Sequence, residues 1–224
     1  MYGILAAAVV AGAGAIGTAL FVRKVRRPMK IIVLGQALTG KTTLLNTWMG
    51  NWSANFPRTS LNPETVRTIK VETGEKTLLV NKKFIFRNGV DISGRDETMF
   101  NFRTDVKAAK AIIYLVDANH LYAEERRPPE HGHADEWVRI IDDGYRIKRY
   151  GREADRVVLV VTHTDQDPRH ASLGPEEYQA QVWQQLKEVI DAIGAPGRTR
   201  VVAGSLATRP AAEELAESVV RSLL

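Results

Sequence analysis

The chain has 224 residues, of which 44% are hydrophobic and 25% are charged, and its formal net charge is +5. This length and apolar content suffice for one domain with a sizeable core. The absence of cysteine excludes disulfide bonds, cysteine-based zinc sites, prenylation and palmitoylation, and Tyr2 at the second position excludes N-myristoylation.

The first feature along the chain is an uncharged, apolar run of 20 residues over 3–22. A helix of this length extends about 30 Å, the thickness of a bilayer core, so the run predicts one membrane-spanning helix. Small residues recur along it at four-residue spacing, which would let two such helices pack closely and self-associate. A cleaved signal peptide is one alternative, but here the basic residues follow the apolar run instead of preceding it. A buried or amphipathic helix of the domain is the other, but the run has no polar face.

A basic cluster follows this run and consists of Arg23, Lys24, Arg26, Arg27 and Lys30. Without these five cations, 26 of the 31 basic residues remain, equal to the 26 acidic residues. The net positive charge of the chain therefore comes from this basic cluster. The cluster favours anionic lipid head groups and gives no reason to expect nucleic acid as a partner. We expect residues 1–28 to form a membrane anchor and tether, and residues 29–224 to form one cytoplasmic domain, following the positive-inside rule.

Residues 35–42 read Gly-Gln-Ala-Leu-Thr-Gly-Lys-Thr and follow the strand-like run 31–34. A strand that turns through glycines into a helix directs backbone N–H groups and the positive end of the helix dipole at one point, where a polyphosphate fits. Lys41 would reach the β and γ phosphates, and the Thr42 hydroxyl would ligate Mg²⁺. The residues of this predicted nucleotide site are Gly35, Gln36, Ala37, Leu38, Thr39, Gly40, Lys41, Thr42 and Thr43.

Strand-like runs alternate with helical stretches along the rest of the chain. This order predicts an α/β fold, a mainly parallel six-stranded sheet with helices on both faces. Strands are expected near 30–34, 66–72, 84–90, 111–116, 157–161 and 200–203. Helices are expected at 41–50, 98–109, 134–149, 175–193 and 210–223.

Three of the predicted strands are followed by short polar motifs. These motifs are Asp91-Ile92-Ser93-Gly94, Thr162-His163-Thr164-Asp165 and Gly204-Ser205-Leu206. A carboxylate such as that of Asp165 can accept both the ring N–H and the exocyclic amine of guanine, a pair of donors that adenine does not offer.

The phosphate loop and these three motifs, in this order, resemble the nucleotide-binding elements of the Ras-like small GTPases. The resemblance extends over 29–224 and implies a P-loop GTPase fold that binds GTP or GDP with Mg²⁺. It implies that Asp91 holds Mg²⁺ through a water molecule and that the Gly94 N–H senses the γ-phosphate. It also implies that the guanine base is held by Thr162, His163, Asp165, Ser205 and Leu206.

The family has a switch threonine that ligates Mg²⁺ when the γ-phosphate is present. Thr59, 17 residues after Thr42, has the family spacing, and Thr65 is its rival; either threonine can instead serve only the loop or the next strand. Arg95 stands where the family usually has a glutamine that orients the attacking water, and arginine cannot accept a hydrogen bond. The predicted catalytic residues are Lys41, Thr59, Gly94 and Arg95, and with arginine at the glutamine position we expect slow hydrolysis. In the base motif, His163 stands where the family has a lysine.

Two functions are compatible with these residues. The first is a membrane-anchored small GTPase that acts as a slow nucleotide-dependent switch and binds a protein partner in its GTP state. The second is a GTP-binding membrane scaffold or receptor subunit with negligible hydrolysis, similar in layout to the beta subunit of the signal recognition particle receptor. An ATP-driven P-loop motor or transporter subunit is disfavoured by Asp165 and by the lack of a strand ending in an Asp-Glu pair.

Overall fold

The computed structural model describes residues 29–36, 38–48, 50, 52, 67–71, 82–88, 103–104, 106–122 and 136–223. The predicted membrane segment 3–22 lies outside these residues, as do Ala37, Thr59, Thr65, Asp91, Gly94 and Arg95. Within the described part, no helix has both the length and the apolar character needed to cross a bilayer.

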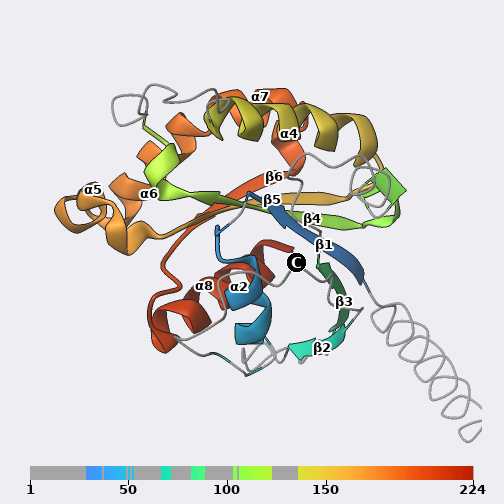
Figure 1. The fold of residues 1–224 in the computed structure, drawn as a ribbon, viewed down its shortest axis with the longest axis horizontal. Helices are drawn as coiled ribbons and strands as arrows, with labels where there is room; N and C mark the ends of the chain where they lie inside the picture. Colours follow the sequence, from blue (N-terminus) through green and yellow to red (C-terminus); the bar gives the residue numbers. More distant parts are fainter. Residues whose placement is uncertain are drawn as a thin grey trace, which may run out of the picture.

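The strands form one sheet in the order β2-β3-β1-β4-β5-β6 (Figure 1). Strand β2 is antiparallel to β3, and every other neighbouring pair is parallel. This arrangement confirms the predicted α/β class with a mainly parallel sheet. The strand bounds are Met29–Gly35 for β1, Arg67–Val71 for β2, Lys82–Asn88 for β3, Ala111–Asp117 for β4, Arg156–Thr162 for β5 and Thr199–Ala203 for β6.

The helices follow the predicted ranges closely, apart from one interruption and one short helix over 168–172 that was not predicted. The predicted helix over 175–193 is divided at Leu186, where the backbone leaves helical geometry with ψ 0°. The predicted helix over 98–109 is described at 103–104 and 106–109, and the backbone is helical at all of these residues except Ala109. The helix bounds are Lys41–Trp48 for α2, Glu136–Tyr150 for α4, Pro168–Ser172 for α5, Pro175–Gln185 for α6, Lys187–Ile193 for α7 and Arg209–Leu223 for α8.

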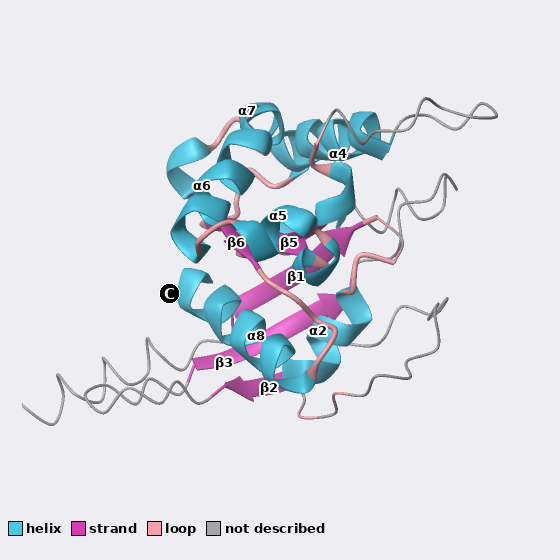
Figure 2. Ribbon diagram, turned by 90° about the vertical axis from the view of Figure 1, so that its left-hand side faces the viewer, coloured by secondary structure: helices cyan, strands magenta, loops and turns pink. Residues whose placement is uncertain are grey.

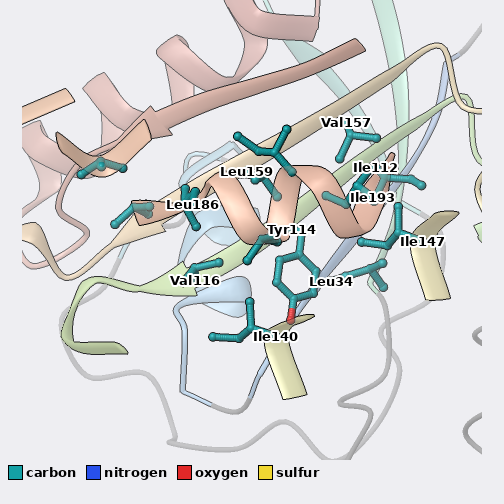
Figure 3. Packing of buried hydrophobic residues seen from close by; sticks show 14 of the residues in the cluster. Leu34, Ile112, Tyr114, Val116, Ile140, Ile147, Val157, Leu159, Leu186 and Ile193 are labelled. Atoms are coloured by element: carbon teal, nitrogen blue, oxygen red, sulfur yellow. The ribbon is translucent and has the colours of Figure 1, made fainter. Parts of the chain in front are cut away.

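Helices cover both faces of the sheet at β1, β4 and β5 (Figures 1 and 2). Alternate residues of β1, β4 and β5 pack against α4, α6 and α7, and the residues between them pack against α2 and α8. This two-sided burial explains why β4 and β5 are continuous apolar runs instead of alternating ones. Figure 3 shows the first of these layers, in which Tyr114 of β4 lies among aliphatic side chains with its hydroxyl directed toward α4.

The connections at β1 and β4 define where a ligand can bind. The chain leaves β1 for α2 on one face of the sheet, and the chain that leaves β4 later forms α4 on the opposite face (Figure 1). Because β1 and β4 are neighbours, their carboxyl ends border the crevice at which ligands of open α/β sheets bind.

Candidate functional site

The predicted phosphate loop connects β1 to α2 through a backbone that only glycine fits at two positions. Gly35 has φ 139°, and a Cβ atom there would lie 2.5 Å from the Leu115 carbonyl oxygen of β4. Gly40 has φ 84°, and a Cβ atom there would collide with Cδ1 of Leu206. The two glycines thus allow the loop to lie directly against β4 and against the loop after β6.

The loop is closed by hydrogen bonds to its own carbonyl groups. Lys41 Nζ donates to the carbonyl oxygens of Gly35, at 2.8 Å, and of Gln36, at 2.5 Å. The Thr39 hydroxyl, which is buried, also donates to the Gln36 carbonyl, at 2.9 Å. The ammonium group therefore lies over the loop at the N-terminal end of α2, the end of a helix that favours anions.

Leu38 lies at the outer side of this loop in a conformation that a bulky residue seldom adopts. Its φ is 62°, in the left-handed region, and its side chain is 66% exposed. Thr42 and Thr43, the second and third residues of α2, are both half-buried. Of the predicted magnesium ligands, only Thr42 belongs to the described part of the chain.

Thr162, at the end of β5, contacts the phosphate loop from the protein interior. Its side chain is fully buried, and its hydroxyl lies 3.0 Å from the Thr39 carbonyl oxygen and 3.3 Å from that of Val116. The first residue of the predicted base motif therefore contacts the phosphate loop through a backbone carbonyl.

Asp165 is held by the loop that follows β6. The Ser205 hydroxyl donates to Oδ1 of Asp165 at 2.5 Å, and the Ala207 N–H donates to the Ser205 hydroxyl at 3.0 Å. Asp165 remains exposed, while Leu206 is buried against Gly40. The fold thus brings together three segments that the sequence predicted to share one site: the phosphate loop, the Thr162 to Asp165 motif and the Ser205 loop.

His163 pairs with Asp117, a contact that sequence analysis did not predict. His163 has φ 57°, and its Nδ1 lies 2.9 Å from Oδ2 of Asp117 at the end of β4. The backbone N–H of Asn119 donates to Oδ1 of the same carboxylate at 2.9 Å. Since a carboxylate only accepts, the proton of this pair lies on Nδ1. Strand β4 places Asp117 beside Thr162, so the pair joins two neighbouring loops.

The pair shifts the pKa of both of its members. The hydrogen bond to Asp117 raises the pKa of His163 against the opposing effect of burial. Burial alone would raise the pKa of Asp117, but the hydrogen bonds from His163 and from the Asn119 N–H together lower it. The contribution of His163 to stability is therefore complete below the unfolded pKa of 6.5 and is lost as pH rises through the folded value.

We expect the unmodified protein to lose more stability between about pH 6 and about pH 9 than a His163→Gln variant does, because only the unmodified protein loses the charged pair. The difference in the free energy of unfolding should be about 1 kcal/mol, the scale of one hydrogen bond to a charged group that is partly screened. Thermal unfolding of both proteins across this range measures it. Parallel pH profiles would contradict the proposed pair.

A second unpredicted contact joins the phosphate loop to α4. Gln36 Nε2 donates to Oδ2 of Asp143 at 2.8 Å, and the Tyr114 hydroxyl donates to the same oxygen at 2.8 Å. Asp143 is only 2% exposed, and burial raises its pKa although the hydrogen bonds from Tyr114 and Arg146 favour the carboxylate. The sequence signal for this contact is an acid within the apolar face of an amphipathic helix, beside Ile140 and Ile147.

Comparisons with known proteins found similarity in structure but none in sequence families. No protein-family model and no curated protein matches the sequence. Among solved structures, a variant of Era from Aquifex aeolicus bound to GDP.AlF4- is similar, with a TM-score of 0.51 and 19% identity, over 87% of this chain and 56% of that chain. The bacterial selenocysteine-specific elongation factor EF-Sec has a TM-score of 0.48 and 17% identity, over 88% of this chain and 29% of that chain.

This chain therefore spans less than two thirds of the length of either protein. At 19% identity, the likeness to Era shows a similar fold and concerns the fold alone.

Proposed function

We propose that the chain is a small GTPase that binds GTP and GDP with Mg²⁺ and acts as a slow nucleotide-dependent switch. The observation that carries this proposal is the junction of three segments at the carboxyl edge of the sheet. Lys41 closes the phosphate loop, Thr162 and Leu206 abut that loop, and Ser205 holds Asp165. In Era, a protein of similar fold, the bound nucleotide is GDP.AlF4-.

The charges of the site residues indicate which part of the nucleotide each of them would bind. The loop backbone and Lys41 would bind the phosphates, and Asp165 would bind the guanine N–H groups. Thr42, Thr59 and Asp91 offer the hard oxygen ligands that suit Mg²⁺, which would neutralise charge on the β and γ phosphates. The Gly94 N–H would sense the γ-phosphate, so that a protein partner recognises the GTP state.

Hydrolysis should be slow because Arg95 occupies the position at which relatives orient the attacking water with glutamine. Relatives without an activating partner turn over at about 10⁻⁴ to 10⁻² per second, and we place this chain at or below the lower figure. A GTP-binding scaffold or receptor subunit with negligible hydrolysis is the second candidate, and Arg95 is the residue that favours it.

One series of experiments tests the proposal. Competition titration of the full chain with GTP and ATP should show a preference for the guanine nucleotide, and equal affinities would contradict it. Single-turnover hydrolysis then separates the two candidates, because a measurable but slow rate supports the switch and no turnover supports the scaffold. Hydrolysis at about 1 per second would contradict both, since it requires a catalytic group at or near Arg95.

We further propose that residues 3–22 anchor the protein as a single-pass membrane protein with the nucleotide-binding domain in the cytoplasm. The apolar run and the basic cluster after it support this orientation. Small residues at four-residue spacing would also permit self-association of the helix. Release of the full-length protein from membranes by carbonate would contradict the anchor.

A further inference from the structure

The hydrogen bonds around Asp143 form a buried polar cluster that consists of Gln36, Tyr114, Asp143 and Arg146. Oδ2 of Asp143 accepts from both Gln36 Nε2 and the Tyr114 hydroxyl, and Oδ1 accepts from Arg146 Nη1 at 3.0 Å. Three charge-assisted bonds thus converge on one carboxylate. Of these four residues, Tyr114 belongs to the apolar layer that Figure 3 shows. Arg146 extends outward and is 36% exposed, so the two bonds through Oδ2 are the inner ones.

Gln36 connects this cluster to the place where the phosphates would bind. Its side chain is fixed by Asp143, while its backbone carbonyl accepts from Lys41 Nζ and from the Thr39 hydroxyl. An ammonium group has three donors, so Lys41 can bind a phosphate with or without its bond to that carbonyl, and the side-chain bond to Asp143 does not depend on which of the two occurs. The bond therefore can hold the loop backbone in place in both situations.

Burial makes this bond selective for one arrangement of the loop. The loss of one of three hydrogen bonds from a carboxylate in the low-dielectric interior is costly, so Asp143 favours the loop conformation that keeps Gln36 Nε2 within reach. Burial and the neighbouring carboxylate raise the pKa of Tyr114, so its hydroxyl remains protonated and can donate to the same oxygen. Tyr114 in turn belongs to β4, beside β1, which fixes the cluster relative to the sheet.

We propose that Asp143 of α4 is a positioning residue for nucleotide binding, which holds the phosphate loop in its binding conformation through Gln36. This inference rests on the proposed nucleotide site. The position of α4 on the sheet then affects the nucleotide affinity, so that a change in this helix alters the rate of nucleotide release although the helix does not contact the nucleotide.

The experiment measures the dissociation rate of a fluorescent GDP analogue from the full chain. Asp143→Ala and Gln36→Met both remove the bond, the second with the side-chain length kept, and each should raise the rate by about ten-fold or more. The double variant should release GDP no faster than the faster single variant, because both changes remove the same interaction. Asp143→Asn retains an oxygen that can accept from Gln36 and Tyr114, so its rate should stay within about three-fold of the unmodified rate.

Asp142→Ala is the matched control, since it removes an exposed carboxylate from the adjacent position of α4. If the effects of Asp143→Ala and Gln36→Met on the dissociation rate multiply in the double variant, the proposal is overturned in favour of general destabilisation. If Asp143→Asn releases GDP as fast as Asp143→Ala does, the proposal is overturned in favour of a charge effect. If Asp143→Ala does not fold, Gln36→Met and Asp143→Asn decide the matter alone. If the unmodified chain binds GDP tightly and the variants release GDP at the unmodified rate, only this inference is contradicted. If the unmodified chain binds no GDP, the proposed function is contradicted as well.

Discussion

Replacement of Lys41 by alanine is expected to abolish tight binding of Mg-GTP. In the structure the ammonium group lies on the carbonyl oxygens of Gly35 and Gln36, directly over the loop that would hold the phosphates. The variant loses a charge-assisted contact to the phosphates and leaves these carbonyls without that donor. The affinity should fall by at least about 3 kcal/mol, or roughly 100-fold, in an equilibrium titration.

The matched control is Lys187→Ala, which removes the same side chain from the exposed first residue of α7. This variant should bind GTP as the unmodified protein does. Far-ultraviolet circular dichroism of both variants establishes that the fold is retained. Near-normal affinity of a folded Lys41→Ala protein would remove the phosphate loop from the proposed site.

Replacement of Asp165 by asparagine is expected to exchange guanine selectivity for xanthine selectivity. The Ser205 hydroxyl donates to Oδ1 of Asp165, so an asparagine in this place keeps its oxygen toward Ser205 and presents its amide N–H groups in place of Oδ2. A donor there opposes the exocyclic amine of guanine and matches the carbonyl oxygen of xanthine. GTP binding should weaken by about 1.5 to 3 kcal/mol while binding of xanthosine triphosphate improves.

Competition titration with the two nucleotides measures this exchange. Asp191→Asn serves as the control, because it makes the same chemical change at an exposed position of α7. An Asp165→Asn protein with unchanged preference for GTP would show that Asp165 does not contact the base. The pairing of Asp165 with Ser205 would then be a purely structural link between the loops after β5 and β6.

The sheet and the phosphate loop follow from local features of the sequence. Strands β4 and β5 are continuous apolar runs because both of their faces are buried, and such runs are visible without a structure. Gly35 and Gly40 mark the turn because their backbone angles and close contacts exclude a side chain. The division of the predicted helix 175–193 at Leu186 has no comparable signal, since it depends on how α6 and α7 pack against the sheet.

By itself, the sequence determined the α/β class, the mainly parallel sheet and the position of the phosphate loop between a strand and a helix, because these features depend on local periodicity and on glycine positions. The grouping of Thr162, Asp165, Ser205 and Leu206 was predicted from the resemblance to the Ras-like GTPases.

Only the tertiary structure decided which side chains pair across that edge. The bond of Gln36 to Asp143 joins residues 107 positions apart, and that of His163 to Asp117 joins residues 46 positions apart. Such contacts depend on strand register and on the position of α4 over the sheet, to which residues far apart in the chain contribute together.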